Sequence, residues 1–119
     1  MPDRTTQSHV LFSSAARTAN ANSESFSVAD KSSAEVAVSV TAISGTSPRM
    51  SLHVEQKGSD AASVWVPHPD GTFGDITDAV STIELTRQLK NLSSNLRLVA
   101  VISGTTPSFT FSAILSAKN

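Results

Sequence analysis

The sequence predicts an all-β chain that folds as an antiparallel β-sandwich of the jelly-roll kind, with about eight short strands. β-Branched and Leu residues alternate with small polar residues over much of the chain. The motif Ile-Ser-Gly-Thr-x-Pro occurs twice, at residues 43–48 and 102–107, and alternating runs flank both copies. Short alternating strands separated by regular turn signals are typical of sandwiches and jelly rolls.

Each copy of the motif predicts a turn. Gly45 and Gly104 can adopt a positive φ without a Cβ clash, and the Ser and Thr beside them can bond nearby backbone groups. Pro48 and Pro107 fix φ near the extended range and direct the residue before them toward the β region. We therefore expect two equivalent β-hairpins, each reversing at its own copy of the motif, as the frame of the fold.

The runs beside the two turns define the expected core. Before the first turn the inward positions are Val36, Val38, Val40 and Ala42. Before the second turn Arg97 must face solvent, so the inward positions there are Leu96, Leu98, Ala100 and Ile102. After the turns the matching inward residues are Met50, Leu52 and Val54 in one copy and Phe109, Phe111 and Ala113 in the other. Aligned on the turns, the two leading strands differ in inward parity, which requires either a β-bulge in one of them or burial of both faces.

Two parts of the chain are expected from composition, an N-terminal arm with short strands (residues 1–33) and a β-sandwich domain (residues 34–119). The arm is short of large apolar residues except for Val10, Leu11 and Phe12 and a second group at 26–28. It is either a partly ordered leader that adds a short strand at each group, or an arm that orders only on a neighbouring subunit. In both cases Val10, Leu11 and Phe12 are candidate contacts with a partner.

The middle of the chain contains the single Trp, Trp65, in an expected short strand at 64–66 that follows a turn at 57–60. A lone Trp in a β-rich domain is expected to anchor the core, and a binding platform is the alternative. Residues 67–71, with two prolines and Asp-Gly, predict a surface loop, and residues 73–77 a weak strand.

Residues 80–92 fit two structures. Leu85, Leu89 and Leu92 have helical spacing, and Ser81 with Glu84 resembles a capping box. The β-branched residues of the same segment fit a strand to about Arg87 followed by a loop. We favour the strand because β structure is predicted on both sides. The last strand is expected to end near residue 116.

Composition excludes several classes of function. The chain has 119 residues, no cysteine, a net charge of -1 and 16% charged residues. The lack of cysteine excludes disulfides and thiolate metal sites, and the weak charge gives no basic surface for nucleic acid. No apolar run approaches the roughly 18 residues of a membrane span, and we expect a soluble chain without an export signal. A surface so poor in charge suits either a monomer or a subunit packed permanently against others.

No pattern of residues points to catalysis or a cofactor. Neither a Gly-x-Ser-x-Gly elbow nor a phosphate-binding loop is present, and His9, His53 and His68 are scattered. We expect no enzyme activity, no catalytic residue and no cofactor.

Two ligand hypotheses stay open. Asp70, Asp75 and Asp78 could offer oxygen ligands to calcium, although their spacing does not match an EF-hand loop and Asp beside Gly is common in turns, so no metal site is predicted. Carbohydrate binding would need exposed aromatic faces, and the chain has one Trp, five Phe and no Tyr.

Three segments carry a resemblance to a known group of proteins. Residues 40–48, residues 96–111 and the leader at 11–18 resemble small virion proteins of tailed bacteriophages, over about residues 10 to 115. The resemblance implies a structural protein of the particle, most like a head decoration (cement) protein that binds the outer face of the shell and stabilises it. Its implied partners are the major capsid protein or other virion subunits, and further copies of itself in a homo-oligomer such as a trimer. It would be made in the host cytoplasm and located on the capsid surface.

Two alternatives to a decoration protein remain. One is a tail or head-fibre component. The other is a carbohydrate-binding β-sandwich module displayed on the virion.

Overall fold

The computed structural model describes residues 6–28, 31–57, 64–77, 83–90, 92 and 94–118. Within these residues the chain forms eight strands, all paired antiparallel, and no helix. The strands are β1 (Thr6–Arg17), β2 (Ala21–Asn22), β3 (Phe26–Ser27), β4 (Ser33–Lys57), β5 (Val66–Thr72), β6 (Ile76–Thr77), β7 (Ile83–Lys90) and β8 (Asn95–Lys118). The predicted all-β, antiparallel sandwich is confirmed. In the described part of the chain no helix could cross a membrane.

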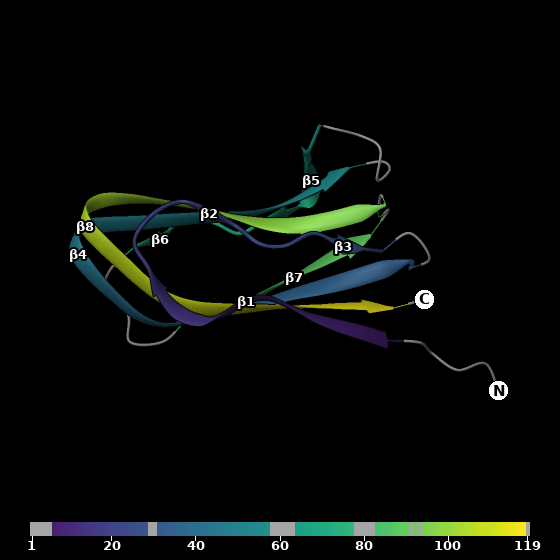
Figure 1. Cartoon of the computed structure of the whole chain (residues 1–119), viewed down its shortest axis with the longest axis horizontal. Helices are drawn as coiled ribbons and strands as arrows, with labels where there is room; N and C mark the ends of the chain where they lie inside the picture. The colour runs from purple at the N-terminus through teal and green to yellow at the C-terminus, as the bar shows by residue number, and fades with distance from the viewer. Residues whose placement is uncertain are drawn as a thin grey trace.

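Two long strands organise the molecule. β4 and β8 pair with each other from Ser33 opposite Lys118 to Lys57 opposite Asn95, and this two-stranded ribbon bends sharply at its middle (Figure 1). The bend places the two halves of the ribbon in two layers that face each other. Sheet I consists of β1, residues 108–118 of β8, residues 33–44 of β4, and β7; sheet II consists of β2, β3, residues 95–103 of β8, residues 49–57 of β4, β5 and β6.

The two Ile-Ser-Gly-Thr-x-Pro motifs meet at this bend, which we call the corner (residues 43–48 and 102–107). Thr46 lies opposite Thr105 in the ladder, so each motif is the partner of the other. The prediction of two separate hairpins is therefore wrong, because neither β4 nor β8 reverses at its motif and both strands continue into the other layer. A single segment cannot distinguish a reversal from a bend, since both need a glycine and a change of backbone direction.

The backbone of the corner is unusual on both strands. Gly45 has φ 111° and Gly104 has φ 120°, as the sequence led us to expect. Ser47 and Thr106, just before the prolines, have φ 49° and 46°, so their predicted β conformation is wrong. These are the positive φ values found among the described residues, and each non-glycine one costs on the order of 1–3 kcal/mol. The two strained segments persist because they pack against each other.

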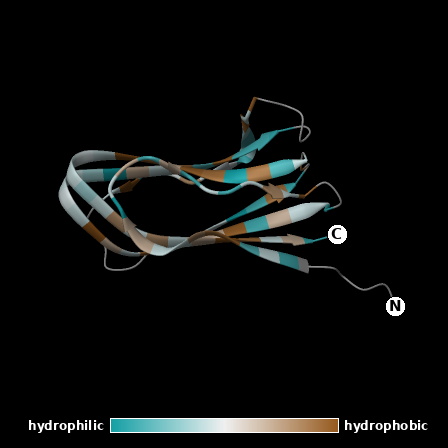
Figure 2. Cartoon of the chain, in the orientation of Figure 1, coloured by the Kyte–Doolittle hydropathy of each residue, from teal (hydrophilic) through white to brown (hydrophobic). Residues whose placement is uncertain are grey.

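The core lies between the two layers. Along β4 and β8 apolar and polar residues alternate (Figure 2), and the inward set is almost completely buried. It includes Val36, Val38, Val40, Met50, Leu52, Val54, Leu96, Leu98, Ala100, Ile102, Phe109, Phe111, Ala113 and Leu115.

A β-bulge explains the parity difference between the two copies. Val40 pairs with Phe111 and Ala42 with Thr110, which leaves Thr41 as the extra residue of β4. After the bulge Ala42 is exposed, so its predicted inward position is wrong.

The leader is part of the sandwich. β1 pairs with the second half of β8, and β2 and β3 pair with its first half, so these strands of the leader belong to both layers. Leu11 and Phe12 are 7% and 6% exposed and belong to the core. Their assignment as partner contacts is wrong, because the apolar side chains are used inside the chain. Val10, at 58% exposure, stays on the surface.

Residues 67–71 form a strand where a loop was predicted. β5 is an irregular strand whose Pro67 lies opposite Glu55, and its register shifts before Thr72 meets His53. β5 pairs along one side with β4, and proline is tolerated in such edge strands because the missing N–H would have faced away from the ladder. Val64 and Trp65 precede β5 instead of forming a strand with Val66.

The segment that fitted either a helix or a strand is a strand. β7 runs to Lys90, past the expected end near Arg87, and β8 runs to Lys118. The expected strand at 73–77 is limited to β6, with Phe73 buried in front of it. The start of the 80–92 segment and the predicted turn at 57–60 beyond Lys57 lie outside the described residues.

Candidate interaction surfaces

The outer face of sheet II holds a group of side chains that we call the Trp65 cluster: Trp65, Lys57, Arg97, Glu55 and His53. Arg97 lies directly opposite Glu55 in the β4–β8 ladder and donates from Nε and Nη2 to Glu55 Oε1, at 2.9 and 2.6 Å. His53 Nε2 is 3.1 Å from Glu55 Oε2. The Trp65 ring lies 4.4 Å from the Arg97 guanidinium carbon and 5.0 Å from Lys57 Nζ, measured from its centroid.

The carboxylate at the centre of this cluster is held in its ionised form. Burial raises the pKa of Glu55, but the hydrogen bonds from Arg97 and His53 outweigh it, so that the pKa lies below its ordinary value. The cluster therefore links β4 to β8 by an ion pair that persists at neutral pH.

Trp65 is not a core residue. It is half-buried and lies outside the buried cluster that contains Phe109 and Phe111. The assignment of Trp65 as a core anchor is wrong, because its ring packs against the side chains of Lys57 and Arg97 instead of the apolar core. Phe109 and Phe111 are fully buried. Nothing local in the sequence signals that Lys57, Arg97 and Trp65 come together.

The outer face of sheet I is different. One row of outward residues crosses all of its strands: Val10 pairs with Ile114, Ile114 with Ala37, and Ala37 with Thr86. Val10 and Ile114 are 58% and 44% exposed. The neighbouring outward positions carry small side chains, Ser8, Ser116, Ser39 and Ser112. We call this surface the sheet I face. Of its charged residues, Glu35 and Glu84 lie in the two rows beside this one, in line with Ser116 and Ser39, and Lys90 and Lys118 lie in the row beyond Glu35.

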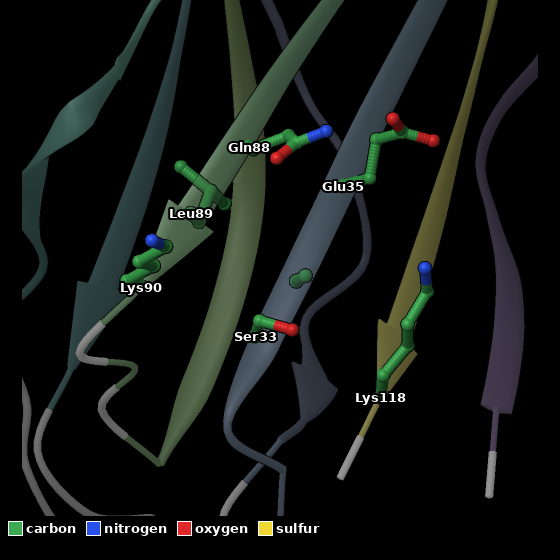
Figure 3. A pocket seen from close by; sticks show the side chains of 7 residues that line it. Ser33, Glu35, Gln88, Leu89, Lys90 and Lys118 are labelled. Carbon is green, nitrogen blue, oxygen red and sulfur yellow. The ribbon is translucent and has the colours of Figure 1, made fainter. Parts of the chain in front are cut away.

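Two shallow hollows lie on the sheet I face. One, of about 120 Å³, lies around Ser33 and Glu35 of β4, between Gln88 and Lys90 on β7 and Lys118 on β8 (Figure 3). The other, of about 220 Å³, lies beside Ile114 and extends over β4 to β7. Binding pockets for small molecules usually measure about 300–1,000 Å³. These hollows are better suited to single side chains than to a substrate.

The histidines have structural contacts. His68 is buried, its Nε2 is 2.7 Å from the carbonyl oxygen of Lys90, and its Nδ1 accepts a hydrogen bond from the Asp70 N–H at 3.0 Å. This arrangement fits a neutral ring that donates from Nε2 and links β5 to β7. His9 of β1 stacks on Phe26 of β3, with ring centroids 4.2 Å apart, and so connects the two layers.

The acidic residues considered for calcium do not gather into one site in the described part of the chain. Asp75 forms an ion pair with Arg49, and the main-chain carbonyl of Asp70 accepts a hydrogen bond from Arg87 Nε. Asp78 lies outside the described residues. Among the described residues no group of three His, Asp or Glu side chains could hold a metal ion.

The edge strand β1 is protected along one half. Arg17 donates to the carbonyl oxygens of Ser13 (2.8 Å), Ala15 (3.1 Å) and Phe111 (3.0 Å). Its guanidinium rests on the rings of Phe12 and Phe111, and this burial lowers the pKa of Arg17. Residues 6–10 pair regularly with β8, and no other described strand pairs with them. An open edge of this kind can accept a strand from another chain.

Comparison with known proteins shows the fold alone. Neither protein-family models nor curated protein sequences give a match. The chain is similar to part of a chain in the structure of infectious bursal disease virus Gx strain, with a TM-score of 0.67 and 11% identity over 98% of this chain. It spans about a third (32%) of that viral chain.

Two further structures match along nearly their whole length. The SPBc2 prophage-derived protein YomS has a TM-score of 0.53 and 9% identity, covering 100% of this chain and 97% of YomS. The CBM22-1 xylan-binding domain of Paenibacillus barcinonensis Xyn10C has a TM-score of 0.52 and 14% identity, covering 94% of this chain and 92% of the domain. The chain thus has a jelly-roll β-sandwich fold that also occurs in viral and carbohydrate-binding proteins.

Proposed function

We propose that this chain is a structural protein of a bacteriophage particle and acts as a head decoration protein that binds the outer face of the capsid shell and stabilises it. The observation that carries the proposal is the fit to the viral chain, whose TM-score of 0.67 exceeds the 0.52 of the xylan-binding domain. The full-length fit to a prophage-derived protein supports the link to bacteriophages. The role needs no catalysis.

The surfaces of the molecule support this proposal. A decoration protein needs a body with accessible faces and edges, and the described residues provide two sheet faces, of which the sheet I face carries shallow hollows of about 120 and 220 Å³. The two layers are also joined into one body, since both share the continuous strands β4 and β8.

The open half of β1 is the proposed attachment element. Residues 6–10 can add to the edge of a sheet in a shell subunit by main-chain hydrogen bonds. Each such contact is weak, but a shell offers the same site many times, and a clustered subunit would bind through several contacts at once.

Binding to shells lacking the protein tests the proposal. Purified protein is mixed with such heads, sedimented and quantified against the major capsid protein, and the melting temperature of the heads is measured. We expect a fixed stoichiometry on the lattice and a higher melting temperature of the heads. Absence from the sedimented heads, or only a few copies per particle, would contradict a decoration role, and few copies would instead indicate a tail or fibre component.

Paired proline variants test the attachment element. In an antiparallel pair the N–H groups of successive residues alternate between the partner strand and the open edge. One of Gln7→Pro and Ser8→Pro therefore breaks a bond to β8 and lowers the melting temperature, whereas the other removes an edge donor and leaves it unchanged. We expect the stable variant to lose shell binding while Gln7→Ala and Ser8→Ala keep it. Normal binding by the stable variant would exclude the edge as the attachment element.

A second candidate is carbohydrate binding, which the Trp65 cluster favours. An aromatic ring that packs on the guanidinium of Arg97, itself bonded to Glu55, combines an aromatic surface with hydrogen-bonding groups. The test is retention of the protein in gels containing xylan or other soluble glycans. Retention of the wild type that Trp65→Ala abolishes with the fold intact would support it, and no retention of the wild type would remove it.

A further inference from the structure

We propose that two copies of this chain pair through their sheet I faces about a two-fold axis that runs parallel to the strands, between β4 and β8. Ile114 of each copy then enters the hollow over Ala37 of the other. This interaction is separate from attachment to a shell and does not depend on it.

The projecting side chain is Ile114. It is 44% exposed at the centre of the sheet I face, in the row that also contains Val10 and Ala37. Ile114 and Val10 are exposed side by side on an otherwise polar face. Burying their apolar surface is favourable by about 25 cal/mol for each Å² removed from water. The apolar row therefore favours being covered.

The receiving hollow lies next to Ile114 on the same face. Its volume is about 220 Å³, and its walls include Ala37, Ser39, Leu85 and Thr86. The hollow exists because Ala37 and Ser39, on β4, have short outward side chains between Ile114 on β8 and the outward residues of β7.

The ladder makes this face self-complementary. Ile114 and Ala37 are direct neighbours across β8 and β4, so an axis that runs between these strands exchanges their positions. Ile114 of the first copy then faces the hollow of the second, and Ile114 of the second faces the hollow of the first, as a closed two-fold interface requires. An axis perpendicular to the strands in this row would set Ile114 against Ile114 and one hollow against the other, so that neither hollow would be filled.

Charge is compatible with the same axis. Lys118 of one copy lies opposite Ser33 of the other, because these two residues pair in the ladder and the axis exchanges them. Glu35 lies opposite Ser116 for the same reason. The described charges of β4 and β8 on this face therefore lie opposite serines and not directly opposite like charges.

The size of the face predicts a weak dimer. Four strands about 4.8 Å apart, with three or four rows of side chains, offer several hundred Å² in each copy. This is the low end for specific interfaces, which bury about 800 Å² in each partner. The dimer should dissociate on dilution.

Sedimentation velocity over a range of concentrations tests the pairing. The wild type should move from monomer to dimer as concentration rises. Ile114→Lys should stay monomeric with an unchanged melting temperature, and Ile114→Ala should weaken dimerisation at least tenfold. The matched control is Val101→Lys, since Val101 is 40% exposed on the outer face of sheet II and should leave the dimer intact.

Mixing two variants tests the geometry. Ala37→Asp fills the hollow with a charge and should be monomeric alone, as should Ile114→Lys. A mixture should form a heterodimer, because the introduced lysine of one variant meets the introduced aspartate of the other while the second contact stays native. A wild type that is monomeric at all concentrations, a dimer unaffected by Ile114→Lys, or variants that stay monomeric when mixed would each overturn the proposal.

Discussion

Two regions of the molecule join β4 to β8 in opposite ways. At the corner the two strands meet through backbone atoms, and a Cβ added to Gly45 would lie 2.6 Å from the carbonyl oxygen of Thr106. In the Trp65 cluster the strands meet through long side chains, and the side chains of Glu55, Arg97 and His53 are 16–27% exposed. The corner leaves no space for a side chain at either glycine, whereas the side chains of the cluster are partly exposed to water.

The difference shows which contacts determine the fold and which are available for other roles. Backbone groups in close contact cannot move apart without breaking ladder hydrogen bonds on both sides. An atom added there is therefore expected to destabilise the whole sandwich. Solvated ion pairs contribute little, with a median of about 0–1 kcal/mol. We therefore expect stability to depend on the corner and surface properties to depend on the cluster.

The largest effect is expected for valine in the corner. Gly45→Val and Gly104→Val each introduce a β-branched residue at φ 111° or 120° and a Cβ within 2.7 Å of a carbonyl oxygen. Backbone strain and overpacking, at roughly 1–3 kcal/mol each, predict a loss of about 4 kcal/mol in the free energy of unfolding. Urea titration measures it. Gly74→Ala is the control, since a Cβ at Gly74 has no neighbour within 4 Å. A loss equal to that of the control would contradict the constrained corner.

A smaller effect is expected at Trp65. Trp65→Ala removes two cation–π contacts, worth roughly 0.5–1 kcal/mol each at exposed sites, together with partial burial of the ring. We predict a loss of about 1–2 kcal/mol in the free energy of unfolding, well below the roughly 3–5 kcal/mol of Phe111→Ala in the core. Thermal denaturation measures both losses. Equal losses in the two variants would indicate that Trp65 contributes to stability as a core residue does.

The pH dependence of stability isolates the ion pair of the cluster. The pKa of Glu55 is lower in the folded chain than in the unfolded chain, whose ordinary value is 4.5. The unfolded chain therefore binds more protons between the two pKa values, and stability falls as pH decreases through this window below about 4.5. Melting temperatures should decrease less steeply for Glu55→Gln than for the wild type in this range. Parallel curves would show that the carboxylate contributes nothing.

The smallest effect is expected for an ion pair without an aromatic cover. Arg49 and Asp75 pair on the same sheet with side chains 61% and 40% exposed. Arg49→Ala should change the free energy of unfolding by less than about 1 kcal/mol. A loss as large as that of Trp65→Ala would contradict the small contribution expected of an exposed ion pair.

The sequence was sufficient for the fold class because alternation and glycine are local signals. Met50, Leu52 and Val54, and likewise Phe109 and Phe111, are buried where the period of two places them. The sequence was insufficient to predict which strands pair. The repeated corner motif indicates two segments with the same backbone geometry, but it does not indicate that they lie opposite each other. Trp65 and Leu11 were misplaced for a related reason, since the partners that decide their burial come from distant strands.

The surfaces were the least predictable part. The row from Val10 through Ile114 and Ala37 to Thr86 combines four segments, and none of them is distinctive alone. Only the ladder register places them together, and register depends on the bulges and the corner.

The pairing of the two corner motifs can be measured directly with the double variant Thr46→Cys, Thr105→Cys. These residues are opposite each other in the ladder, where facing Cα atoms of antiparallel strands are typically about 4.5–5.5 Å apart, a separation that a disulfide accepts, and the chain has no other cysteine. We predict that the folded variant oxidises to a single intramolecular disulfide, detected by a mass loss of two hydrogens and a linked peptide pair after digestion. Two free thiols in a folded, oxidised sample would contradict the pairing of the motifs in the bent ribbon.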